Sequence, residues 1–348
     1  MDGKKDQIMV RLGSTGIEVN KNGFGALPIQ RISDEEAVYL LKKAYQGGIR
    51  FFDTARGYSD SEHKLGLAFE KIRESLFIAT KSGAVTGEGM RKDLADSLSN
   101  LRTDYIDIYQ FHNPAFCPKP GDGSGLYEAA LEAKKEGKIR HIGITNHRLS
   151  VAGEAISSGL YETLQFPFCY LATEKEEGLV EGCRKADMGF IAMKALSGGL
   201  ITNSAAAYAH AAQFENVLPI WGVQREKELD EFLSYISQPP AMTEERKALI
   251  EKDRKELAGE FCRGCGYCMP CPVGIEINNC ARMSLLLRRS PSQLQLTEEA
   301  KEKMMKIKDC LQCNQCKGKC PYGLDTPTLL RKNLEDYENV LAGRVKVQ

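Results

Sequence analysis

The chain has 348 residues, 42% of them hydrophobic, with 47 Lys and Arg balanced by 47 Asp and Glu. This balance excludes a broadly basic surface for nucleic acid, and the lack of any run of about 18 apolar residues excludes a membrane-spanning helix. The first residues, MDGKKDQIMVRLG, lack the apolar stretch of a secretory signal, so we expect a cytoplasmic protein.

The first 237 residues alternate between helical and strand patterns. A capping box at residues 33–36 begins the first clear helix. Eight short apolar segments are typical of strands, and helical patterns lie between them; the segments are 23–27, 50–54, 76–81, 105–112, 139–146, 163–168, 190–195 and 217–223. Eight strand–helix units predict an α/β fold of the (β/α)8 TIM-barrel type. An open doubly wound sheet is the alternative, because periodicity does not show whether a sheet closes.

A change of composition marks the end of the predicted barrel. Pro239 and Pro240 interrupt the helical pattern, and residues 241–261 contain eleven charged residues. We therefore predict a barrel over residues 1–237, a linker helix over 238–260 and a smaller domain over 261–348. Helical patterns at about 276–289 and 297–308 indicate that the smaller domain is mostly α-helical.

Nine of the twelve cysteines lie in this smaller domain, between residues 262 and 320. Clustered thiols in a reducing compartment indicate metal ligands rather than disulfides. They form two blocks, each followed by proline: Cys262, Cys265, Cys268 and Cys271, then Cys310, Cys313, Cys316 and Cys320. The second block has the C-x2-C-x2-C-x3-C-P spacing of bacterial ferredoxins, in which the fourth cysteine binds the other cluster.

Crossed ligation of two 4Fe-4S clusters follows from this spacing. The last cysteine of each block joins the first three of the other, so Cys320 joins the first block and Cys271 the second. The spacing before Cys271 is x2 rather than x3, which leaves its ligand role less well defined. Two zinc sites are the alternative. Cys280 is left over and is better interpreted as an apolar core residue. The helical insert between the blocks resembles the α-helical ferredoxin domains of respiratory and heterodisulfide-type reductases.

Residues 9–237 contain a series of distinctive motifs. They are RLGSTGIEV and GFG near the start, then FFDTARGYSDSEHKLGLAF, FIATKSG and DIYQFHNP. With these motifs, the region resembles the aldo-keto reductases. The resemblance implies a TIM barrel with a catalytic tetrad of Asp53, Tyr58, Lys81 and His112. The cysteine-rich region resembles that of the ferredoxin-linked subfamily. The implied activity is a nicotinamide-dependent exchange between a small-molecule carbonyl and its alcohol.

The chemistry of hydride transfer needs residues of these four types. A hydride that reaches a carbonyl carbon leaves negative charge on the oxygen, so a proton donor must lie there. Tyr58 would donate this proton, Lys81 would stabilise the phenolate, and Asp53 would keep Lys81 charged and oriented. His112 would hold the carbonyl oxygen by a hydrogen bond.

The same resemblance implies contacts to the cofactor, for which NADP(H) is favoured and NAD(H) remains open. Met193 stands where many relatives have an aromatic ring against the nicotinamide, and a helix N-terminus after the last strand is expected at the adenosine phosphate. The implied contact residues are Gly25, Thr145, Asn146, Gln165, Met193, Lys194, Gly198, Gln224 and Arg225.

The two predicted halves carry electrons differently. Nicotinamide moves a pair as hydride, whereas each cluster moves one electron at a time, so coupling them normally needs a converter such as flavin, for which we find no motif. Three hypotheses follow. The clusters exchange electrons with a redox partner protein, or they are structural or regulatory, or the chain is an electron carrier with an inactive barrel.

Overall fold

The structure is a computed structural model that describes residues 7–257, 261–289 and 292–347. The chain forms two units. The first contains residues 1–195 and 205–244, and the second contains residues 196–204 and 245–348. Residues 258–260, the end of the predicted linker, lie outside the described residues. The predicted smaller domain begins directly after them, at residue 261. Each unit is described by itself.

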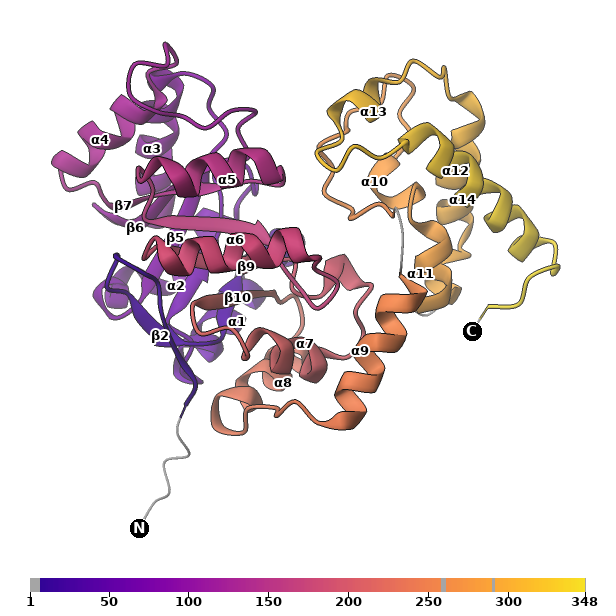
Figure 1. Ribbon diagram of the computed structural model, residues 1–348, viewed down its shortest axis with the longest axis horizontal. Coiled ribbons are helices and arrows are strands. Elements are labelled where there is room, and N and C mark those ends of the chain that lie inside the picture. Colours follow the sequence, from indigo (N-terminus) through magenta and orange to yellow (C-terminus); the bar gives the residue numbers. More distant parts are fainter. Residues whose placement is uncertain (1–6, 258–260, 290–291, 348) are drawn as a thin grey trace. The chain divides into compact units, whose positions relative to one another are not determined.

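The first unit is a closed barrel of eight parallel strands (Figure 1). The strands follow one another around the barrel in chain order: β3 (Gly23–Gly25), β4 (Phe51–Asp53), β5 (Phe77–Ser82), β6 (Ile106–His112), β7 (Ile139–Thr145), β8 (Thr163–Pro167), β9 (Gly189–Met193) and β10 (Val217–Gly222). β10 pairs with β3 in parallel, with Trp221 opposite Phe24, and this pairing closes the sheet. All eight predicted segments form strands, so the TIM-barrel prediction is confirmed and the open-sheet alternative is wrong.

Helices follow the strands around the barrel: α1 (Asp34–Gln46), α2 (Ser61–Phe69), α3 (Gly87–Leu101), α4 (Leu126–Lys135), α5 (Leu149–Ser158), α6 (Glu174–Lys185), α7 (Ser204–Ala211) and α8 (Glu226–Ser237). The predicted capping box begins α1. The Glu36 amide donates to the Ser33 hydroxyl at 3.2 Å, and the Ser33 amide donates to the Glu36 carboxylate at 3.3 Å. The buried residues Ala37, Leu40 and Ala44 lie three or four positions apart, so they form the one face that packs inward.

An antiparallel hairpin of β1 (Met9–Arg11) and β2 (Glu18–Asn20) precedes the barrel. The hairpin buries Val10 and Val19, which are partners in its register. These side chains form one hydrophobic cluster with barrel residues that include Phe51 at the start of β4. The hairpin therefore covers the end of the barrel at which the strands begin, and it leaves the carboxyl ends of the strands for the site.

The second unit is helical, and no strand occurs in the part of it that the structure describes. Its helices are α9 (Glu244–Glu256), α10 (Ile277–Cys280), α11 (Met283–Arg289), α12 (Glu298–Met305), α13 (Gln315–Lys319) and α14 (Thr326–Leu341). The core includes Ile277, Leu287 and Tyr337, together with Cys280, whose thiol donates to the Lys303 carbonyl at 3.6 Å. The α-helical prediction for this region is confirmed. Within the described ranges, no helix is long and apolar enough to cross a membrane.

Candidate functional sites

The four residues of the expected tetrad come from adjacent parts of the barrel. Asp53 is the last residue of β4, Lys81 lies in β5, and His112 is the last residue of β6. Tyr58 lies in the turn between β4 and α2. Because β4, β5 and β6 are neighbouring parallel strands, their carboxyl ends meet at one edge and bring these residues together.

Asp53 and Lys81 form a buried ion pair. The Lys81 Nζ lies 2.7 Å from each carboxylate oxygen of Asp53 and donates to the Thr54 carbonyl at 2.6 Å. Asp53 and Lys81 are 2% and 1% exposed, respectively. Burial raises the pKa of Asp53 and lowers the pKa of Lys81, while the charge of each partner opposes the shift of the other. Lys81 is thus held in place by three oxygen acceptors at a buried position beside its ion-pair partner.

Lys81 also lies next to Tyr58. Its Nζ is 5.2 Å from the centroid of the Tyr58 ring, and the Tyr58 and His112 rings lie edge to face with centroids 5.8 Å apart. Burial, and after it the charge of Lys81, lowers the pKa of His112 to about 3. At neutral pH the imidazole is therefore uncharged, and it acts by hydrogen bonding rather than as a cation. The structure thus brings all four expected residues together.

A pair of glutamines extends this network. The Gln165 side-chain amide donates to Asp53 at 3.2 Å, and Gln110 donates to the Gln165 carbonyl oxygen at 2.8 Å. Gln165, expected at the nicotinamide, thus contacts the Asp53 carboxylate. Gln110 was missed by sequence reasoning. Its signal was its place two residues before His112 on β6, because alternate residues of a strand face the same side.

The other expected cofactor residues of the first unit fall mostly at strand ends. Gly25 ends β3, Thr145 ends β7 and Met193 ends β9. The Thr145 hydroxyl lies 3.9 Å from the Met193 sulfur. A Cβ at Gly25 would come within 3.2 Å of the Trp221 carbonyl, so a side chain there would crowd the neighbouring strand. The residues Gly25, Thr145 and Met193 therefore occupy the same end of the barrel as the tetrad.

Asn146 already has several hydrogen bonds. Its amide nitrogen donates to the Pro114 carbonyl at 2.9 Å, and its oxygen accepts from the amides of His147 and Arg148. The side chain thus joins the loop after β6 to the start of α5. Lys194 directly follows β9 and has a positive φ of 57°, and Gly198 belongs to the second unit.

Gln224 and Arg225 immediately precede α8, as the expected phosphate site requires. Their backbone amides both donate to the Glu228 carboxylate, at 2.9 and 3.0 Å. The Arg225 side chain is exposed. The start of α8 therefore already holds one negative charge, supplied by the protein itself.

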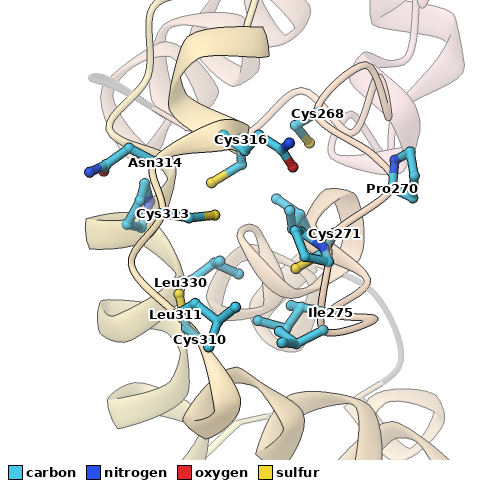
Figure 2. A pocket seen from close by; sticks show the side chains of 15 residues that line it. Cys268, Pro270, Cys271, Ile275, Cys310, Leu311, Cys313, Asn314, Cys316 and Leu330 are labelled. Carbon is cyan, nitrogen blue, oxygen red and sulfur yellow. The ribbon is translucent and has the colours of Figure 1, made fainter.

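The eight block cysteines line two pockets of the second unit. One pocket is lined by Cys262, Cys265, Cys268 and Cys320. The other is lined by Cys271, Cys310, Cys313 and Cys316, and Cys268 also reaches it. Figure 2 shows the second pocket, with Cys310, Cys313 and Cys316 on one side and Cys268 and Cys271 on the other. In both pockets, cysteines from the two blocks meet although about forty residues separate the blocks in sequence.

Comparison with known proteins assigns the family. Residues 21–234 match the aldo/keto reductase family, and residues 261–325 match a 4Fe-4S dicluster domain. The chain belongs to the aldo/keto reductase family. It is an oxidoreductase of that family with a 4Fe-4S dicluster domain after the barrel.

Curated relatives match the barrel region. The chain is 29% identical to L-galactose dehydrogenase from Arabidopsis thaliana over 59% of this chain and 70% of that protein. It is 37% identical to the methylglyoxal reductase DkgB from Escherichia coli O157:H7, over 37% of this chain and 49% of that protein. The match thus spans about half the length of the methylglyoxal reductase.

Solved structures share the barrel fold. Aldo-keto reductase AKR11C1 from Bacillus halodurans superposes with a TM-score of 0.64 at 20% identity, over 73% of this chain and 99% of that chain. An aldo-keto reductase from Klebsiella pneumoniae in complex with NADPH superposes with a TM-score of 0.60 at 19% identity, over 71% of this chain and 95% of that chain. These likenesses show the fold.

Proposed function

We propose that the barrel interconverts a small-molecule carbonyl and its alcohol by hydride transfer, with Tyr58 as the general acid and base. The observation that carries this proposal is the buried Lys81–Asp53 pair beside the Tyr58 ring at the carboxyl end of the barrel. A nicotinamide nucleotide, NADP(H) or NAD(H), would supply the hydride. The binding of NADPH by a relative of the same fold supports NADP(H).

Each residue of the tetrad then has a defined task. In the reduction, the Tyr58 hydroxyl gives its proton to the carbonyl oxygen, and the oxygen becomes the hydroxyl group of the alcohol. The positive charge of Lys81 stabilises the phenolate that remains, and Asp53 keeps Lys81 in position. His112 is neutral, so it donates a hydrogen bond to the carbonyl oxygen without adding a charge. In the oxidation, the phenolate takes the proton back.

The barrel residues at the strand ends are proposed to hold the nucleotide. Thr145, Met193 and Gly25 surround the end of the barrel at which the tetrad lies. Asn146, Gln165, Lys194, Gly198, Gln224 and Arg225 complete the proposed set. Gln165 is bonded to Asp53, so a contact from it to the nicotinamide would also connect the nucleotide to the tetrad.

A substitution at Tyr58 tests the proposal. Tyr58→Phe keeps the ring but removes the proton donor, and general acid catalysis of this kind contributes about 10²–10⁴-fold. We expect a loss of kcat in that range when oxidation of NADPH or NADH is followed with a panel of small aldehydes and ketones. Tyr45→Phe, the same change on α1 outside the site, is the control and should leave kcat unchanged. Full activity of Tyr58→Phe would contradict the proposal.

For the second unit we propose two 4Fe-4S clusters with crossed ligation. Cys262, Cys265, Cys268 and Cys320 would hold one, and Cys310, Cys313, Cys316 and Cys271 the other. The observation is that each set lines one pocket. The donor set fits, because thiolates are the ligands of such clusters and the pocket of Figure 2 is otherwise lined largely by apolar groups such as Ile275 and Leu330.

The family comparison favours clusters over the zinc alternative, because residues 261–325 match a 4Fe-4S dicluster domain. Eight cysteines also equal the number of ligands that two clusters with four thiolates each require.

Paired cysteine variants test the crossed ligation. Under crossed ligation, Cys262 and Cys320 serve the same cluster, so replacing both with alanine removes one cluster. Cys310 and Cys320 serve different clusters, so replacing both damages two. We therefore expect more iron per chain in the first double variant than in the second after anaerobic reconstitution. The opposite order would indicate that each block binds its own cluster.

We propose that the clusters exchange single electrons with a redox partner protein in the cytoplasm. A structural or regulatory role is the second candidate, and one observation favours it: Cys262, Cys268 and Cys316 are part of the hydrophobic core of their unit. Chemical removal of the clusters separates the two. A loss of turnover with unchanged thermal unfolding of the second unit supports electron exchange, whereas a lowered unfolding temperature with unchanged turnover supports a structural role. If turnover and thermal unfolding are both unchanged, both roles are wrong. The assembled tetrad argues against a carrier with an inactive barrel.

A further inference from the structure

Residues 196–204 follow β9 in the chain but group with the second unit. Two arginines of that unit hold this segment by its backbone. Arg282, directly before α11, donates from Nη2 to the Gly198 carbonyl at 2.7 Å. Arg289, the last residue of α11, donates from Nε to the Leu200 carbonyl at 2.7 Å. The conformation of the segment therefore depends on the placement of two guanidinium groups.

The two arginines differ in their remaining partners. Arg289 is also bonded to two carboxylates of α9, to Asp253 at 2.5 Å and to Glu256 at 2.8 Å. The Nε and Nη1 of Arg282 are buried and find no hydrogen-bond partner among the residues that the structure describes. Buried donors of a charged group are costly when unpaired, so an acceptor is expected beside them.

The surroundings of Arg282 indicate what kind of acceptor would suit these donors. The guanidinium lies between two glycines: a Cβ at Gly264 would be 2.7 Å from Nη1, and a Cβ at Gly198 would be 2.8 Å from it. Both glycines have positive φ, 63° and 64°. The Gly264 amide donates to the Cys262 sulfur at 3.4 Å, and Cys262 interacts electrostatically with Arg282. The unpaired donors therefore lie next to the first proposed cluster.

We propose that Arg282 is a positioning residue that couples loading of the cluster at Cys262 to the conformation of residues 196–204. The inference rests on the proposed cluster binding. Thiolates and sulfides around the iron carry negative charge, so they would accept from Nε and Nη1 while Nη2 stays on the Gly198 carbonyl. The guanidinium is then held from both sides. Without the cluster it keeps only the Gly198 side, and the segment loses part of its support.

This coupling gives the cluster a regulatory consequence. Residues 196–204 continue directly from β9, and Gly198 is one of the residues proposed to hold the nucleotide. A segment whose conformation depends on the cluster would make nucleotide affinity respond to the loading of the cluster.

Hydrogen exchange measured by mass spectrometry tests the inference on the full chain. We compare protein reconstituted anaerobically with the same protein after removal of iron. In the wild type, peptides covering residues 196–204 should exchange several-fold more slowly when the clusters are present. In Arg282→Gln they should exchange at the faster rate even with clusters loaded. Arg288→Gln is the matched control, because Arg288 lies on α11 but pairs with Asp336 of α14; it should behave as the wild type.

A second measurement separates this role from a purely structural one. Removing the positive charge beside Cys262 should shift the midpoint potential of that cluster to a more negative value in Arg282→Gln, as followed by an EPR redox titration. If Arg282→Gln fails to load iron, Arg282→Lys replaces it. Lysine keeps the positive charge but lacks the planar guanidinium, so it does not bond the Gly198 carbonyl and the cluster at the same time. The cluster should therefore load, and residues 196–204 should still lose their protection from hydrogen exchange.

The outcomes distinguish the inference from the proposed function. A wild type that binds no iron after reconstitution refutes the cluster proposal itself. If the wild type loads clusters and the arginine variant keeps the loading-dependent protection of residues 196–204, the coupling is wrong. An unchanged midpoint potential in Arg282→Gln would overturn the contact between the guanidinium and the cluster.

Discussion

Asp53→Asn is the most informative single change in the barrel. It replaces a carboxylate that is 2% exposed and bonded twice to Lys81 at 2.7 Å. The variant leaves Lys81 buried without the carboxylate of its ion-pair partner, so the charged form of Lys81 is disfavoured. Breaking a buried pair in this way costs about 3–5 kcal/mol of the free energy of unfolding. Activity should fall as well, because Lys81 would lose both its charge and its orientation beside Tyr58.

Tryptophan fluorescence measures the stability of the barrel in these variants. Trp221 is the single tryptophan of the chain and lies buried on β10, so its fluorescence reports on unfolding of the barrel alone. Urea titrations of wild type and Asp53→Asn give the difference. Glu132→Gln is the control, since its partner Arg91 forms an exposed pair with it, and such pairs contribute at most about 1 kcal/mol.

A double variant completes the experiment. Asp53→Asn combined with Lys81→Met removes both charges, and replacing a buried pair by uncharged groups is often neutral for stability. The double variant should therefore be more stable than Asp53→Asn, while remaining inactive. A loss of less than about 1 kcal/mol in Asp53→Asn, equal to that of Glu132→Gln, would refute the reasoning, because the pair would then behave like an exposed one.

Three further predictions concern other residues of the barrel. His112 has a pKa of about 3 in the folded protein against an ordinary value of 6.5, so its contribution to stability is present above pH 6.5 and is lost as the pH falls toward 3. The free energy of unfolding, followed by tryptophan fluorescence, should therefore fall less between pH 7 and pH 5 in His112→Gln than in the wild type. Glu228→Gln removes the negative charge at the start of α8, so fluorescence titrations should show tighter NADPH binding relative to NADH, whereas Glu231→Gln on the same helix should not. Gln110→Ala leaves Gln165 without its donor, and kcat should fall with a smaller change than for Tyr58→Phe; an unchanged kcat would contradict the role given to Gln110.

The secondary structure of the barrel was predictable because its signals are local. Segments such as 105–112 are apolar runs of strand length, and the capping box at Ser33 is a contact between residues three apart. The tetrad could be placed for a related reason. Once the strands are known, residues at their carboxyl ends must meet at one edge of a parallel barrel.

Contacts between distant parts of the chain could not be predicted in this way. Gln110 donates to Gln165 across fifty-five positions, and neither residue carries a local sign of the other. The Glu228 carboxylate accepts hydrogen bonds from the backbone amides of Gln224 and Arg225, directly before α8. The sequence shows only a helix start with acidic residues, and this pattern does not reveal whether those amides are already bonded or are open to a phosphate.

Sequence alone indicated the residues to which we assign the chemistry of this protein: the tetrad through the resemblance to the aldo-keto reductases, and the two cysteine blocks through their spacing. Only the tertiary structure decided which pocket each cysteine lines and that residues 196–204 group with the second unit rather than with the barrel. The physical reason is that spacing along a chain defines local geometry. Which distant segments pack together depends on the burial and hydrogen bonds of the whole fold, as Arg282 and Gly198 show across eighty-four positions.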